Sequence, residues 1–286
     1  MSPRLYTFQF GRVLLITGSG LEEKRELYSE VFSKPHPVSD FYNKYVFFDV
    51  QEIPIDQDSF IVGKLIKYKT KLEDVVIEDS ALGTSQVEDA IVAQPEFVLH
   101  PYTGIVAFRV MPGKFNASQF KNKFARLIEA AFDNFFISAK VETVNEELKI
   151  EEQFNLFTSL HSICLELHPS NPHNNDLWRE IDDKIKALGA VEYNQQVVAP
   201  EGRSLNKEEV ANSEIYAGII MASDGYGHAS IEGIQENGRR VKVTTDDNPI
   251  ETKTHLDGEP EHLVKQLTQT FKMVWDRVKN EHKDKN

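Results

Sequence analysis

The sequence has few residues that could support covalent or redox chemistry. Only one cysteine, Cys164, occurs in 286 residues, which excludes an intramolecular disulfide and a cysteine-based zinc site. It lies in the apolar run "LHSICLELHP", where a free cysteine usually fills space in a core strand, so we expect a structural role. A catalytic thiol would need a histidine close in space, and His161 and His168 are near it in sequence.

Long apolar runs are also missing. No window approaches the roughly eighteen uninterrupted apolar residues of a membrane-spanning helix. The most apolar segments, "SFIVGKLI" and "EIYAGIIMA", have the length of strands. The N-terminus "MSPRLYTFQF" lacks the apolar centre of a signal peptide. We therefore expect a cytoplasmic protein without membrane insertion.

Positive charge is in deficit. The chain carries 45 acidic and 32 basic side chains, a net charge of −13. The first 150 residues contain 17 basic and 21 acidic side chains and the remainder 15 and 24, so both parts are acidic. This charge opposes non-specific adhesion to nucleic acid or anionic lipid. Any contact with DNA must therefore come from a local basic patch.

Hydrophobic periodicity predicts a mixture of strands and helices. Short β-rich runs fill the first third, and "NASQFKNKFARLIEAAFDNF" then predicts a helix with Asn116 or Ser118 as its N-cap. Strand-like and helix-like segments alternate from "FISAKVETV" to "VEYNQQVVA", which indicates helices packed on an open or ferredoxin-like sheet. The apolar face of the first long helix comprises Phe120, Phe124, Leu127, Ile128 and Ala131.

The polar, turn-rich segment "PEGRSLNKEEVANS" predicts a domain boundary. We expect an N-terminal α+β domain over 1–200 and a C-terminal domain over 201–286, a β-meander from "EIYAGIIMAS" onward followed by a long helix that starts at Pro260. A meander followed by one long helix also occurs near 44–132. The predicted fold class is α+β, with two such units, a central alternating β/α segment and two domains.

Two strands carry rows of basic residues. In "IQENGRRVKV", Asn237-Gly238 predicts a two-residue type I′ turn, with Glu236 opposite Arg239. Alternation then places Arg240 and Lys242 together on the solvent face. The ordinary interpretation is a solvated outer face, and the functional one is a contact to phosphates.

A second basic row lies in "GKLIKYKTKL". Three lysines alternate with other residues and share one face of an extended strand, about 6.5–7 Å apart, close to the spacing of phosphates along nucleic acid. An edge strand that lysines protect from aggregation explains the same pattern. The candidate nucleic-acid-binding residues are Lys67, Lys69, Lys71, Arg239, Arg240 and Lys242.

Catalytic and metal-binding patterns are weak. His168 and His173 in "LHPSNPHNN" could ligate a metal, but the sequence offers no third ligand. Glu147-x-Lys149 and Glu251-x-Lys253, after upstream aspartates, are similar to the acidic–lysine pattern of metal-dependent nucleases, although an acidic chain produces such matches by chance. We therefore predict no catalytic residue, no metal site and no cofactor.

Three segments resemble the RexA phage-exclusion family and its relatives near phage-defence genes. They are "TSQVEDAIVAQPEFVLHPYTGIVAFRV", "GHASIEGIQENGRRVKV" and "LVKQLTQTFKMVWDRVKN", and the likeness extends over most of the chain in order and length. The resemblance implies a two-domain α+β protein that dimerises and binds DNA with little sequence preference. It also implies a sensor or adaptor in abortive infection rather than an enzyme.

The expected function is therefore a non-catalytic component of a bacterial or prophage anti-phage system. Its expected partners are double-stranded DNA, a second copy of the chain and a protein from the same operon. An alternative is an acidic protein that binds and regulates a toxin or a nucleic-acid-binding protein. A metal-dependent nuclease is a third possibility.

Overall fold

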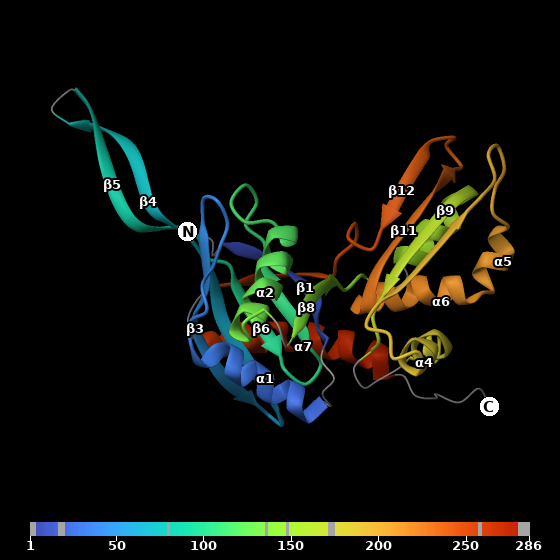
Figure 1. The fold of residues 1–286 in the computed structure, drawn as a ribbon, viewed down its shortest axis with the longest axis horizontal. Helices are drawn as coiled ribbons and strands as arrows, with labels where there is room; N and C mark the ends of the chain where they lie inside the picture. Colours follow the sequence, from blue (N-terminus) through green and yellow to red (C-terminus); the bar gives the residue numbers. More distant parts are fainter. Residues whose placement is uncertain are drawn as a thin grey trace.

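Two antiparallel β-sheets with helices packed on them organise the chain (Figure 1). This computed structural model describes residues 4–16, 21–78, 81–134, 137–146, 149–170, 175–256 and 259–279. The fold class is α+β, as the sequence predicts.

The first sheet has nine strands in the order β13-β1-β7-β6-β4-β3-β2, with β5 paired to β4 and β8 paired to β1. The long strand β1 pairs with β13, β7 and β8 in successive parts of its length, so it joins both ends of the chain within one sheet. The strands are β1 (Leu5–Ile16), β2 (Val38–Ser39), β3 (Lys44–Ile55), β4 (Asp58–Glu78), β5 (Ala81–Ala93), β6 (Glu96–His100), β7 (Ile105–Arg109), β8 (Ser138–Thr143) and β13 (Glu251–His255).

Helices cover both faces of this sheet. Helices α1 (Leu21–Ser33) and α2 (Ala117–Ala131) bury apolar side chains on one face, and α7 (Pro260–Lys279) packs on the other. On the α2 side the rings of Phe108 and Phe120 stack with centroids 4.2 Å apart. Alternate residues of the central strands β1, β6 and β7 therefore point into two separate cores, which explains why these strands read as nearly continuous apolar runs.

The start of α2 follows from its sequence. Asn116 is the N-cap: its side chain accepts a hydrogen bond from the Gln119 backbone N–H, and the Gln119 side chain accepts one from the Asn116 N–H. This reciprocal capping box satisfies two amide groups that a helix start leaves unpaired. The predicted helix is confirmed, and of the two predicted caps the structure uses Asn116.

The second sheet has four strands in the order β10-β9-β11-β12. Helices pack on one of its faces, where Trp178, Ile181, Ile185 and Ile219 meet the inward side chains of the strands. The elements are α3 (Lys149–Leu156), β9 (Phe157–Leu167), α4 (Arg179–Ala187), β10 (Tyr193–Val198), α5 (Lys207–Ala211), α6 (Glu214–Met221), β11 (Gly227–Gln235) and β12 (Arg240–Thr244).

Several sequence predictions need correction here. "EIYAGIIMA" forms helix α6 rather than a strand, because Ser213 caps the Ile215 amide and a short apolar run fits either a buried helix or a strand. The segment 200–213 contains α5. The predicted boundary at 200 runs through the second sheet, since β9 before it pairs with β11 after it. The alternating segment is not one layer, because β8 belongs to the first sheet.

A buried charged group joins the two sheets. Asp224 lies in a π-helical turn, η1 (Ala222–Tyr226), between α6 and β11 and is 3% exposed. Its carboxylate accepts hydrogen bonds from Arg277 Nη2 and Trp178 Nε1, both at 2.9 Å, and its backbone carbonyl accepts one from Arg12 Nε at 3.0 Å. Arg12 belongs to β1 and Arg277 to α7. Asp224 therefore ties the first sheet and the helix packed on it to the second sheet.

Phe124→Ala should destabilise the protein by about 3–5 kcal/mol, because the ring is fully buried in the core between α2 and the first sheet. Chemical denaturation of both proteins measures the difference. Phe41→Ala is the matched control: that ring is fully exposed, so we expect a change within about 0.5 kcal/mol. A loss below about 1 kcal/mol for Phe124→Ala would show that α2 does not pack as described.

Candidate functional site

The six predicted basic residues lie in two groups at opposite ends of the molecule (Figure 1). Lys67, Lys69 and Lys71 belong to β4, where a two-stranded ribbon leaves the body of the first sheet. Arg239 precedes β12, the edge strand of the second sheet, and Arg240 and Lys242 lie in it. The structure therefore does not bring the two rows together on one groove.

The hairpin that carries the second group has a different turn from the predicted one. Gln235 N–H donates to the Arg239 carbonyl, so three residues form the loop, and Gly238 adopts a φ of +74°. A three-residue loop that ends in a left-handed glycine is a common hairpin alternative to the type I′ turn. The predicted pairing of Glu236 with Arg239 is wrong for this reason.

The shifted register still leaves Arg240 and Lys242 on one exposed face. Arg240 pairs with Ile234 and Lys242 with Glu232 across the ladder. Arg240 is 67% exposed and its Nε donates to Glu232 at 2.8 Å. An exposed ion pair of this kind contributes little to stability, so Arg240 can exchange Glu232 for another anion at a small cost in free energy.

Strands β4 and β5 continue past the body of the first sheet as a projecting arm (Figure 1). At its base Lys67 Nζ lies 6.0 Å from the centre of the Phe115 ring and Lys69 is half-buried. The side chain of Lys71 lies outside the described part of the chain. From residue 70 to 90 the sequence has six acidic residues and one lysine, a net charge of −5.

The second sheet has one face that no helix covers among the described elements. Exposed or half-buried residues of its four strands alternate with the inward ones, and this face includes Gln196, Cys164, Ser230 and Lys242. Cys164 pairs with Gln196 and Ser230 and is half-buried. It is therefore not the core residue that the apolar run predicted.

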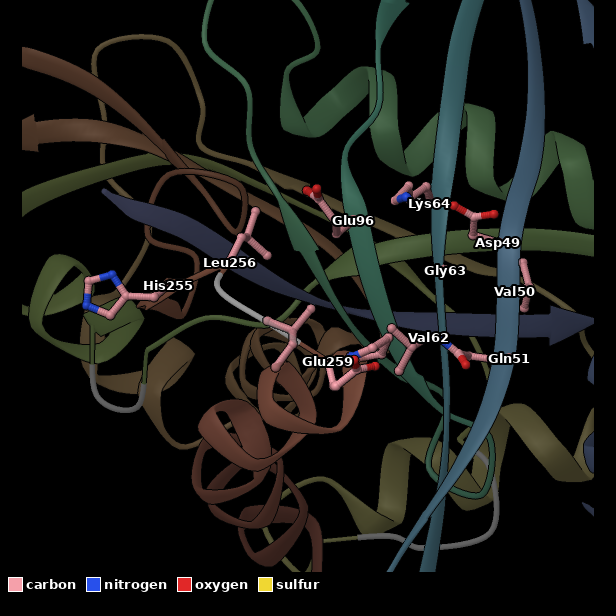
Figure 2. Close-up of a pocket in the computed structure, with 12 residues that line it drawn as sticks. Asp49, Val50, Gln51, Val62, Gly63, Lys64, Glu96, His255, Leu256 and Glu259 are labelled. Carbon is pink, nitrogen blue, oxygen red and sulfur yellow. Dashed lines mark hydrogen bonds and ion pairs between the residues drawn. The ribbon is translucent and has the colours of Figure 1, made fainter. Parts of the chain in front are cut away.

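A cavity of about 530 Å³ lies between strands β3 and β4 and the start of α7 (Figure 2). A bulge in β3 gives Asp49 a φ of +52° and directs its carboxylate at Lys64 Nζ, 2.7 Å away. Gly63 lets the side chains of Val50 and Phe97 approach the β4 backbone, because a Cβ there would lie 2.9 Å from atoms of both.

The charged groups of this cavity are largely paired with protein atoms. Glu96 forms a two-pronged ion pair with Arg109 at 2.9 and 3.2 Å, and His255 Nδ1 lies 3.2 Å from the Arg4 carbonyl oxygen. The twelve described lining residues include no serine, threonine, cysteine or tyrosine. The described lining therefore offers no hydroxyl or thiol nucleophile, and its polar groups are carboxylates, an amide, a lysine and a histidine.

Polar residues gather where the first sheet meets the second. Asp246, just after β12, accepts hydrogen bonds from Thr143 and from Lys121 Nζ, and its other carboxylate oxygen lies 3.8 Å from His228 Nδ1. Glu142 faces the same junction, and burial raises its pKa to about 7 while Lys121 opposes this shift.

The junction also contains the histidine that the sequence singled out. His168 is 1% exposed, and the structure brings Glu166 and Glu192 beside it. The spacing Glu166-x-His168 at the end of β9 could have indicated that these two side chains lie together. Glu192 follows α4 in the sequence, and no local pattern connects it with them. His173 and Glu147 lie outside the described residues.

No described helix is both long and apolar enough to cross a membrane.

Glu142→Gln should change how stability depends on pH. The raised pKa means that the folded state holds this proton more tightly than the unfolded state, whose value is near 4.5. Stability contributed by Glu142 is therefore lost as the pH rises from about 4.5 to about 7. Denaturation at pH 5 and pH 8 measures this. The free energy of unfolding of the variant relative to the parent should be higher at pH 8 than at pH 5. Glu236→Gln, in the exposed hairpin loop, is the control, and an equal pH response of all three proteins would contradict the expectation.

Comparison with known proteins gives a family but no activity. No curated protein matches the chain. A family model described as a domain of unknown function, DUF4747, matches residues 13–272. The match includes the second sheet, the first sheet apart from most of β1, the arm, the cavity and most of α7. The chain therefore belongs to the DUF4747 family.

Proposed function

We propose that this protein is a non-catalytic sensor or adaptor of an anti-phage system, which binds double-stranded DNA with little sequence preference and acts as a homodimer. The likeness of three segments to the RexA family supports the biological role. The observation that carries the DNA contact is the exposed basic end of the edge strand β12, which holds Arg239, Arg240 and Lys242.

The geometry of β12 suits contacts to a phosphate backbone. Its only strand neighbour among the described elements is β11, so its outer edge is open. Arg240 and Lys242 share one face two residues apart, and the ion pair with Glu232 already holds the Arg240 guanidinium on an anionic oxygen. Contacts of this kind fix position on the duplex without reading bases, which agrees with weak sequence preference.

The arm supports self-association. A two-stranded ribbon is marginally stable alone in water, and this one has no third strand in the described part beyond Lys69. Along β4 the arm is basic near its base, at Lys67, Lys69 and Lys71, and acidic further out, at Glu73, Asp74 and Glu78, while Glu88 of β5 pairs with Lys71. Two arms crossing antiparallel about a two-fold axis would therefore place each basic base beside the partner's acidic outer part.

Charge reversal at β12 tests the DNA contact. Arg240→Glu with Lys242→Glu should weaken binding to all duplex sequences alike and lower the slope of log affinity against log salt by about 0.9 for each phosphate that the protein no longer neutralises. Glu232→Gln should strengthen binding, because it releases Arg240. Electrophoretic mobility at several salt concentrations measures both.

Lys265→Glu with Lys272→Glu is the control, since both lysines are exposed on α7 and the net charge changes equally. If the two double variants lose affinity to the same extent, the β12 contact is wrong. If the parent does not bind DNA even at low salt, the alternative of an acidic protein-binding regulator is favoured.

A charge swap tests the arm. Lys69→Glu with Lys71→Glu should weaken the dimer, because both arms become acidic throughout. Adding Glu73→Lys and Asp74→Lys should restore it, since opposite charges face each other again. Analytical ultracentrifugation over a range of concentrations measures the dimer constant. A parent protein that stays monomeric, or a four-fold variant that fails to recover, would contradict dimerisation through the arm.

A further inference from the structure

A buried histidine at the junction of the two sheets has an unsatisfied nitrogen. His168 Nδ1 lies 3.0 Å from the Val191 carbonyl oxygen, which can only accept, so Nδ1 carries the proton of the neutral ring. Nε2 then presents a lone pair, and it is buried without a hydrogen-bond partner among the described residues. A buried polar atom without a partner costs free energy, so this arrangement calls for a ligand.

Two carboxylates converge on the same point. Glu166 precedes His168 by two residues at the end of β9, so their side chains share a face, and its Oε1 lies 3.7 Å from Nε2. Glu192 is the residue before β10. Its neighbour Tyr193 pairs with Leu167 of β9, which places Glu192 near the end of β9. One donor atom from each of His168, Glu166 and Glu192 lies within 4.8 Å of the other two.

A cation already occupies the space between the carboxylates. Lys140 Nζ, from β8 of the first sheet, lies 2.6 Å from Glu166 and 2.7 Å from Glu192. The ammonium group neutralises one of the two negative charges but makes no hydrogen bond to His168 Nε2, which stays without a partner among the described residues. A divalent ion would balance both carboxylates and accept the imidazole lone pair as well.

We propose that Glu166, His168 and Glu192 form a binding site for a divalent transition-metal ion of the Zn²⁺ class, and that Lys140 occupies this site when the metal is not bound. Zinc holds histidine nitrogen and carboxylate oxygen at about 2.0–2.2 Å in tetrahedral geometry, so its ligands lie about 3.4 Å apart. The 3.7 Å between His168 and Glu166 is close to this value.

The surroundings match those of known zinc ligands. The Val191 carbonyl orients the imidazole through its other nitrogen, as a backbone acceptor commonly does behind a metal-bound histidine. Imidazole with carboxylates favours zinc over magnesium or calcium, which take six or more oxygen ligands. The carboxylates are 42% and 37% exposed, so an ion can enter from solvent and keep a fourth, open position.

Zinc binding to the full-length chain tests the site, by calorimetry with ZnCl₂ in competition with a chelator. The parent should bind one Zn²⁺ per chain at this site. His168→Ala and Glu192→Gln should each weaken it at least tenfold, and Lys140→Met should strengthen it at least tenfold, because the competing ammonium is gone. Glu192 is partly exposed, so Glu192→Gln tests the site even if the buried His168 variant does not fold.

Glu214→Gln is the matched control, because Glu214 also forms a surface ion pair with a lysine, Lys184, but has no histidine beside it. Its zinc affinity should equal that of the parent. The proposal is overturned if the parent shows no saturable binding, or if Glu192→Gln and Lys140→Met bind zinc as the parent does. The second result would place the ion on other histidines of the chain.

Discussion

The burial of Asp224 between two arginines is the constraint on which the arrangement of the two sheets depends. A carboxylate at 3% exposure is unfavourable unless opposite charge and hydrogen bonds surround it. Arg277 from α7 and the indole of Trp178, the residue just before α4, supply the hydrogen bonds to its oxygens.

Arg12 completes this arrangement and reaches further into the first sheet. Its guanidinium lies over the Tyr226 ring at 4.4 Å and donates to the Thr103 carbonyl in the β6–β7 connection. The π-helical turn that holds Asp224 also leads directly into β11. The charge network therefore fixes where the second sheet starts relative to the first, and with it the polar junction that contains Lys140, Glu166 and His168.

Lys140 connects the proposed metal site with the relation between the sheets. It extends from β8 of the first sheet to two carboxylates of the second, so it bridges the two layers in the same region as the Lys121–Asp246 pair. An ion that displaced Lys140 would replace a contact between the sheets with one inside the second sheet alone. The proposed site thus lies where a ligand can affect how the basic end of β12 and the arm are held relative to each other.

Charge is distributed so that each proposed contact stands out against the acidic chain. The basic end of β12 and the base of the arm lie at opposite ends of the molecule (Figure 1). The cavity between β3, β4 and the start of α7 has charged side chains that are mostly paired internally, with Lys64 on Asp49 and Glu96 on Arg109.

Local signals in the sequence were sufficient for several elements. The spacing of Phe120, Phe124 and Leu127 and the capping residue Asn116 determined α2, and Pro260 marked the start of α7. Alternation placed Arg240 and Lys242 on one exposed face even though the turn differed, because a period of two survives a change of loop length when both residues lie on the same strand. The class, α+β, followed from these patterns.

Tertiary structure decided what depends on partners distant in sequence. "EIYAGIIMA" has no period that separates helix from strand, and its packing on Leu165 and Ile181 made it α6. Pairing of β9 with β11 across residue 200, and the separation of the two basic rows, arise from strand order. Glu192 and Lys140 meet the carboxylate of Glu166 beside His168 only because β10 pairs with β9 and Lys140 reaches across from β8 of the first sheet. The sequence by itself determined helices such as α2 and α7 and the exposed face of β12, since these depend on neighbours a few residues apart. Sites built from several strands depend on contacts that only the folded chain creates.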